Sequence, residues 1–208
     1  MKSRTLSEFY RSPDYKGPFC GNLVPAITLN ERGVGSDMIY TGSNQRVPEF
    51  HSWACLVRGL GARSYVELGV GSAWSIRDAG VTNIVTVDLL PGGLPGIPHV
   101  QGNSHDLESL HQVLTLLGGP PDIVFIDADH TYEGCRDDFD MWYPAARLAI
   151  GFHDIRLREG CDRFWDEVSQ QYSSVEIIGR DHASAEKWQG THDGAGRLWA
   201  GGIGVIFK

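Results

Sequence analysis

Short apolar segments that alternate with helical segments constrain the fold of this chain more than any other feature. Apolar residues recur with helical spacing in four segments, which are expected to be helices: 47–60, 105–117, 132–142 and 160–172. Strands are expected at 64–69, 83–88, 99–102, 122–128, 147–152, 174–179 and 202–207. Several of these strands are almost continuously apolar, which is typical of parallel strands covered on both faces. The alternation predicts an α/β fold with a doubly wound parallel sheet.

The composition argues against several classes of protein. A chain of 208 residues is most simply one domain, large enough to bury a full core. Its net charge of −8 disfavours a large nucleic-acid surface, which would need many Lys and Arg side chains. No apolar run approaches the ~18 residues of a membrane-spanning helix, and the N-terminus lacks the apolar core of a secretory signal. We therefore expect a cytoplasmic protein without a nucleic-acid or membrane partner.

The cysteines point to the same compartment. Cys20, Cys55, Cys135 and Cys161 are widely spaced and form no Cys-x-x-Cys pair. Three of them fall in the expected helices, where a cysteine commonly acts as a small buried apolar residue. We therefore expect free thiols in a reducing environment.

Two segments outside the regular pattern are candidates for substrate recognition. Residues 1–46 alternate proline and glycine with aromatic residues and are expected to form an irregular arm or lid, with room for one short helix. The 180–201 loop is longer than most loops without a function. Tyr40, Trp188 and Trp199 are candidate walls of a substrate site. Residues 47–208 form the expected main domain.

A glycine turn follows the first strand of the alternating region. Gly69 and Gly71 let the backbone bend sharply and let a ligand approach it closely. The N-terminus of a helix after such a turn presents free N–H groups to an anionic group, and Glu67, just before the turn, could accept bonds from an amine or hydroxyl. The turn alone is weak evidence, because many such turns are purely structural. Asp88 ends the next strand about 20 residues later, the spacing at which a carboxylate commonly accepts both hydroxyls of a ribose. A solvated strand-end carboxylate is the alternative.

Polar residues also follow the later strands. Asn103 and Ser104 precede a helix and suit either ligand contact or helix capping. Asp127 and Asp154 end neighbouring strands, so their carboxylates, with His153, could bind Mg²⁺, or Mn²⁺ if imidazole joins. His130 is a candidate general base. The alternatives are that His130 caps the next helix and that His153 only bonds locally.

The order of these motifs resembles the class I S-adenosylmethionine-dependent methyltransferases. The motifs are Glu-Leu-Gly-x-Gly, Val-Asp, Gly-x-Ser-x-Asp, Phe-Ile-Asp-Ala-Asp-His-x-Tyr-Glu and Phe-His-Asp-Ile. Within the class, the chain is most similar to the small O-methyltransferases, the group that contains catechol-type and macrolide- or sugar-type enzymes. The resemblance covers 47–208. It implies a Rossmann-like methyltransferase fold, with seven strands, mostly parallel, and an antiparallel last strand.

The resemblance also implies the roles of individual residues. Those that would contact S-adenosylmethionine are Glu67, Gly69 and Gly71 at its methionine part, Ser75 at its carboxylate, Asp88 at its ribose, and Ser104 and His105 at its adenine. The metal-ligand positions are Asp127, His153 and Asp154, and His130 occupies the place of the catalytic lysine of catechol-type enzymes. Asp127 and His130 are therefore the expected catalytic residues.

This chain departs from the family pattern at several points. Ala73 replaces the third glycine of the usual turn, and His153 stands where many relatives have Asp or Glu. The Pro- and Gly-rich segment 89–98 replaces the helix expected between the second and third strands. These departures affect the metal and substrate predictions more than the cofactor prediction.

We therefore expect O-methylation of a small-molecule acceptor, with a divalent metal as a candidate assistant. One rival is a nicotinamide-dependent oxidoreductase, although Trp74 stands where its third glycine belongs. A second is a metal-dependent hydrolase built on Asp127, Asp129, His130, His153 and Asp154. A non-catalytic binding protein on the same fold is a third. The sequence makes no prediction for the acceptor or the oligomeric state.

Overall fold

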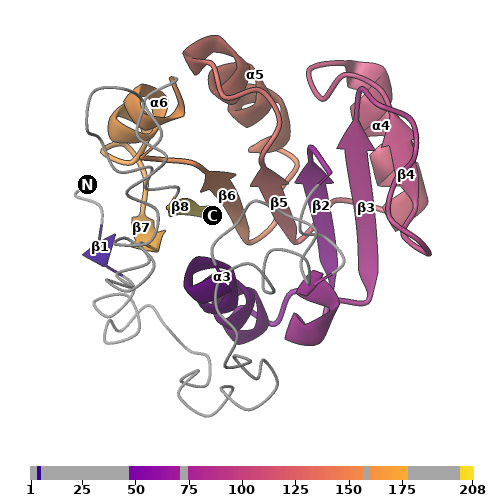
Figure 1. Cartoon of the computed structure of the whole chain (residues 1–208), viewed down its shortest axis with the longest axis horizontal. Helices are drawn as coiled ribbons and strands as arrows, with labels where there is room; N and C mark the ends of the chain where they lie inside the picture. The colour runs from indigo at the N-terminus through magenta and orange to yellow at the C-terminus, as the bar shows by residue number, and fades with distance from the viewer. Residues whose placement is uncertain (1–3, 6–46, 71–74, 157–159, 178–201) are drawn as a thin grey trace, which may run out of the picture.

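The computed structural model describes residues 4–5, 47–70, 75–156, 160–177 and 202–208. Within these ranges eight strands form one sheet, in the order β1-β7-β8-β6-β5-β2-β3-β4 (Figure 1). The strands are β1 (Arg4–Thr5), β2 (Ser64–Leu68), β3 (Asn83–Asp88), β4 (His99–Gln101), β5 (Ile123–Ile126), β6 (Ala149–His153), β7 (Ser174–Ile177) and β8 (Ile203–Phe207). The helices are α3 (Val47–Gly59), the 3-10 helix η2 (Ser75–Ala79), α4 (Leu107–Leu117), α5 (Tyr132–Trp142) and α6 (Cys161–Val168).

The sheet confirms the predicted architecture. All neighbouring strands are parallel except β8, which runs antiparallel to both β6 and β7. The prediction of seven strands omitted β1, whose two residues pair with β7 at the edge of the sheet. The remainder of the predicted arm, and the 180–201 loop, lie outside the described residues.

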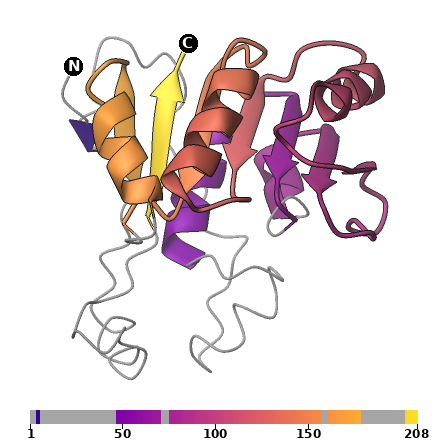
Figure 2. The ribbon, with the colours of Figure 1, turned by 90° about the horizontal axis from the view of Figure 1, so that it is seen from above.

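Two separate apolar cores cover the two faces of the sheet. On one face α3 and η2 pack against the sheet, with Trp53 stacked on Phe125 at a centroid distance of 5.2 Å. On the other face lie α4, α5 and α6, seen as a row in Figure 2. Because successive residues of a strand point to opposite faces, the fully buried Glu67 shares the α3 face with Tyr65.

Some predicted elements differ from the observed ones in extent. The helix expected after the glycine turn is the five-residue 3-10 helix η2. The helix α4 begins at Leu107, with Asp106 as its N-cap, so Asn103 and Ser104 do not cap it. Its buried residues are Ser109 and Val113, whereas Leu107 at its start is exposed.

The cysteine prediction was wrong for two of the four residues. Cys135 and Cys161 form a disulfide between the first turns of α5 and α6, with their Cα atoms 5.9 Å apart. They are 26 positions apart in sequence, and only the side-by-side packing of the two helices brings them together. Cys55 is free and buried, as predicted, and Cys20 lies outside the described residues. Because disulfides persist mainly in oxidising compartments, this pair does not support the expectation of a cytoplasmic location.

Along the part of the chain that the structure describes, no helix is both long and apolar enough to cross a bilayer.

The position of β2 determines where a ligand can bind. The chain passes from β2 to β3 and β4 on one side, then returns to β5 and β6 on the other side. The strand order therefore reverses at β2. In an open α/β sheet, ligands bind beyond the carboxyl ends of the strands at such a point.

Candidate functional site

A cavity of about 450 Å³ lies at the carboxyl ends of the central strands. The segments that line it are 69–70, 87–89, 102–105 and 127–129, which end or follow β2, β3, β4 and β5. Its volume falls in the range that holds a cofactor or drug-sized molecule. The structure thus brings together at one edge the strand-end residues that the sequence singled out.

The glycine turn forms one wall of this cavity. Gly69 has φ +84°, and a Cβ atom there would overlap the backbone carbonyl of Asp127. Its N–H donates to Val87 O at 2.8 Å, while Asp127 N donates to Leu68 O at 2.9 Å. Only glycine therefore permits this close contact between the loops after β2 and β5.

Of three further residues predicted around the turn, one lies away from the described cavity lining and two have no described side chain. Glu67 is fully buried in β2 and is not part of the lining. Gly71 lies outside the described residues. Ser75 begins η2, but its side chain is not described. Contacts of these three with a ligand remain predictions.

Asp88 lies in the cavity wall at the end of β3. Its Oδ2 accepts a hydrogen bond from Val70 N at 3.0 Å, and its Oδ1 accepts one from Leu90 N at 2.8 Å. These bonds hold the carboxylate between the glycine turn and the loop after β3. Because each carboxylate oxygen has two acceptor positions, both oxygens keep one for a ligand hydroxyl.

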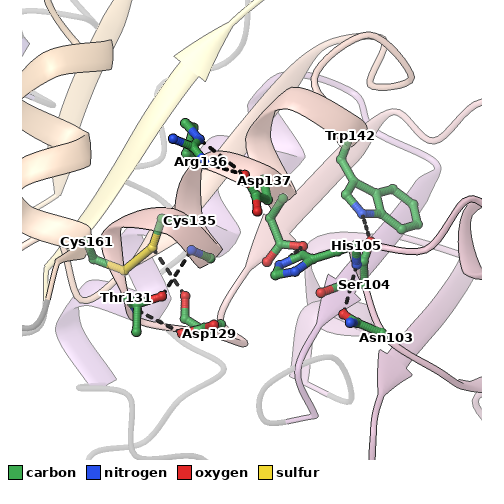
Figure 3. Close-up of polar contacts among 12 residues, drawn as sticks. Asn103, Ser104, His105, Asp129, Thr131, Cys135, Arg136, Asp137, Trp142 and Cys161 are labelled. Atoms are coloured by element: carbon green, nitrogen blue, oxygen red, sulfur yellow. Dashed lines mark hydrogen bonds and ion pairs between the residues drawn. A yellow bond between two sulfur atoms is a disulfide. The ribbon is translucent and has the colours of Figure 1, made fainter.

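The segment after β4 forms another part of the cavity wall. Asn103 Oδ1 accepts from His105 N at 3.0 Å, and Trp142 Nε1 donates to Ser104 O at 2.9 Å (Figure 3). Asn103, Ser104 and His105 all line the cavity. The predicted adenine-contact residues are thus held by local bonds and by a side chain of α5.

Four side chains meet beyond the ends of β5 and β6. His153 Nδ1 lies 3.0 Å from Asp127 Oδ1 and 3.2 Å from Asp154 Oδ2. His130 Nε2 lies 3.0 Å from Asp154 Oδ2 and 3.5 Å from Asp127 Oδ1. One potential ligand atom from each residue lies within 4.8 Å of the other three. His130, which the methyltransferase interpretation predicted as a base, therefore joins the predicted metal ligands in a single cluster.

The backbone of Asp154 is unusual. It has φ 57° and is the one non-glycine residue with positive φ among those described. This conformation is strained for a residue with a side chain and is often found at functional sites. It lets the residue directly after β6 turn its carboxylate toward His130 and His153.

The charges within the cluster stabilise one another. The close carboxylates of Asp127 and Asp154 raise the pKa of His130 to about 10. Burial opposes the charge of His153, but Asp127 and Asp154 still raise its pKa to about 10. Burial likewise opposes ionisation of the two carboxyls, yet the histidines keep the pKa of Asp127 and of Asp154 below the usual range. Without a cation, two imidazolium groups therefore face two carboxylates at neutral pH, and a metal must displace protons to bind.

Asp129 lies outside this cluster. Its Oδ1 accepts from Thr131 N at 2.9 Å, and the Thr131 hydroxyl caps α5 by accepting from Gly134 N at 3.0 Å (Figure 3). Asp129 thus supports the start of α5. The ligand set predicted for a metal-dependent hydrolase therefore does not assemble with all five of its members.

Sequence reasoning missed Asp138, a buried residue of α5 next to His105. A signal was available, because Asp138 lies on the same helix face as the apolar residues Cys135, Phe139 and Trp142. A charged residue on a buried stripe needs an explanation.

Comparisons with known proteins identify the fold. No family model and no curated protein matches the chain. Among solved structures, the O-methyltransferase from Bacillus cereus in complex with SAH is 17% identical, with a TM-score of 0.52; the match covers 84% of this chain and 87% of that one. Cofactor-bound Rv0187 from MTB is 21% identical, also with a TM-score of 0.52, over 82% of this chain and 85% of that one.

A third structure matches over a shorter length. The MycE methyltransferase from the mycinamycin biosynthetic pathway, in complex with Mg and SAH, is 22% identical with a TM-score of 0.41. The match covers 50% of this chain, which spans 30% of the length of MycE. The two longer matches, together with the observed strand order, establish that this chain has a Rossmann-like methyltransferase fold.

Proposed function

We propose that this protein binds S-adenosylmethionine in the cavity and transfers its methyl group to an oxygen atom of a small molecule. One observation carries the proposal. The same cavity is lined by the glycine turn, by Asp88 with its two backbone hydrogen bonds, and by Asp127, which belongs to the cluster of two carboxylates and two histidines. The cofactor's sulfonium supplies the methyl group, and the protein must align the donor with the acceptor. The acceptor oxygen bonds to the methyl carbon as the carbon–sulfur bond breaks, which releases S-adenosylhomocysteine.

The walls of the cavity suit the parts of this cofactor. Asp88 offers two acceptor positions to the ribose hydroxyls. Ser104 and His105, in the lining after β4, would contact the adenine. Gly69 and Gly71 would contact the methionine part, with Glu67 and Ser75 completing that end.

The cluster fits a divalent cation. Asp127, His153 and Asp154 would hold it, and His130 lies close enough to be a fourth ligand. When bound, the cation would position the acceptor hydroxyl and lower its pKa. His130 can take the hydroxyl proton only as a neutral imidazole, so its ion pairs with Asp127 and Asp154 must first be broken. The imidazole of His153 favours Mn²⁺ over Mg²⁺, because Mg²⁺ prefers oxygen ligands.

Calorimetry tests the cofactor assignment directly. We expect the protein to bind both S-adenosylmethionine and S-adenosylhomocysteine, and not NADH. A hydrolase built on the cluster would bind metal but neither nucleoside. Failure to bind either sulfur nucleoside would contradict the proposal, and binding of NADH in their place would support the oxidoreductase.

The choice of metal is testable by substitution at His153. EDTA-treated protein should bind Mn²⁺ more tightly than Mg²⁺, and His153→Glu should shift the preference toward Mg²⁺ by about 10-fold, because a carboxylate replaces an imidazole. Thermal unfolding with each metal measures the change. His111→Ala, an exposed histidine of α4, is the matched control. An unchanged ratio in His153→Glu would remove His153 from the ligand set.

A further inference from the structure

Asp138 is a buried carboxylate that the proposed chemistry does not use. The residue has 0% of its surface exposed, and neither carboxylate oxygen makes a hydrogen bond of ordinary geometry within the described part of the chain. Burying a carboxylate without such bonds is costly. The groups that face it are the Ser104 hydroxyl and, at 3.4 Å from Oδ1, His105 Nε2. A function at the neighbouring cavity wall would explain why a carboxylate is buried here.

His105 links Asp138 to the cavity. Its Nε2 is buried and, within the described residues, faces Asp138 without an ordinary hydrogen bond, whereas the side chain as a whole is 25% exposed and lines the cavity. Trp142, one helical turn after Asp138, binds the carbonyl of Ser104. The helix α5 thus contacts the 104–105 segment at two points, as Figure 3 shows for Trp142. A hydrogen bond from Nε2–H would satisfy both buried groups at once.

We propose that Asp138 is a positioning residue that accepts a hydrogen bond from His105 Nε2–H and so leaves Nδ1 as a hydrogen-bond acceptor for the base of the bound nucleoside. In neutral imidazole one nitrogen donates and the other accepts, so the partner of one nitrogen determines the role of the other. Adenine carries an exocyclic amino group, which donates, whereas hypoxanthine has a carbonyl oxygen at the same position. The pair therefore selects a 6-aminopurine over a 6-oxopurine. This inference rests on the proposed binding of an adenine nucleoside.

The charges around the pair define the conditions for a test. Burial raises the pKa of Asp138 to about 6, so the carboxyl is ionised at about pH 8. Asp129, which is exposed, is the other carboxylate whose charge acts on Asp138 and on His105. Measurements at about pH 8 keep both carboxylates ionised.

Competition between two nucleosides tests the selection. We expect the wild type to bind S-adenosylhomocysteine roughly 10- to 100-fold more tightly than S-inosylhomocysteine, since the oxo group would face an acceptor. Asp138→Leu removes the acceptor for His105 and should bring the ratio of the two affinities close to one. Asp138→Asn, whose carbonyl oxygen can still accept, should retain part of the preference for S-adenosylhomocysteine. Asp140→Leu, at an exposed position of α5, should keep the full ratio. Equal weakening of both nucleosides in Asp138→Leu, with the ratio unchanged, would show a merely structural role and overturn the proposal.

The tautomer of His105 can be measured without any bound nucleoside. Nitrogen-15 NMR of the free protein should show His105 protonated at Nε2 and not at Nδ1, and Asp138→Asn, the milder change, should keep this tautomer in part. A ring protonated at Nδ1 alone would overturn the proposal even if Asp138→Leu does not fold. If neither nucleoside binds the wild type, the proposed function fails, while the NMR result still decides whether Asp138 orients His105.

Discussion

Replacing Asp88 with alanine should weaken binding of S-adenosylhomocysteine by about 100-fold or more, because hydrogen bonds to a charged group each contribute about 1.5–3 kcal/mol. The variant loses two acceptor positions for the ribose. It also releases Val70 N and Leu90 N, which hold the glycine turn and the following loop against the carboxylate. Calorimetry measures the affinity, and thermal unfolding checks that the variant is folded.

Two further variants make the Asp88 result specific. Asp88→Asn keeps one acceptor oxygen and should bind with intermediate affinity. Asp140→Ala removes an exposed carboxylate of α5 that is not part of the cavity lining and should bind as the wild type does. If Asp88→Ala bound S-adenosylhomocysteine with unchanged affinity, Asp88 would not contact the cofactor.

Replacing Asp127 with asparagine should lower the affinity for Mn²⁺ by about 100-fold or more, because metal sites depend on deprotonated, charged ligands. The amide keeps the shape of the side chain, and the backbone N–H of residue 127 keeps its bond to Leu68 O. A loss of metal binding would therefore report the charge and not the fold. Calorimetry with Mn²⁺ on EDTA-treated protein is the measurement, and Asp166→Asn, an exposed residue of α6, is the control. Unchanged Mn²⁺ affinity would exclude Asp127 as a ligand.

The same variant should change how stability depends on pH. His130 and His153 both have a pKa raised to about 10, so the stability they contribute is complete below their unfolded pKa of about 6.5. It is lost as the pH rises toward 10. Metal-free wild type should therefore lose stability between about pH 7 and pH 10, and Asp127→Asn should lose less, since the histidines have one carboxylate fewer. Thermal unfolding of EDTA-treated protein across this range tests the expectation; parallel curves would contradict it.

Local patterns in the sequence were sufficient for most of the fold. Buried parallel strands are almost continuously apolar and helices repeat every three to four residues, so both are visible within a short window. The glycine at the turn and the acid at the end of β3 were also visible locally. The antiparallel direction of β8 followed from the resemblance to a family, not from any local pattern.

The functional site depended on contacts between distant segments. The order of the motifs placed Asp127 and Asp154 at neighbouring strand ends, but the packing of side chains turned His130 into their cluster. The disulfide between Cys135 and Cys161 required α5 and α6 to lie side by side. The pairing of Asp138 with His105 required α5 to pack under the loop after β4. None of these contacts produces a periodic pattern in the sequence, because the residues involved lie in different segments of the chain.

Local sequence was thus enough to predict the strands, the glycine turn and Asp88, because backbone propensity and apolar periodicity depend on residues that are close along the chain. Tertiary structure decided which ionisable groups meet, because the charge of a histidine or carboxyl depends on the groups within a few ångströms in space. His130 illustrates the difference. Its position after β5 made it a candidate base, and its contacts with Asp127 and Asp154 made it a protonated member of the cluster.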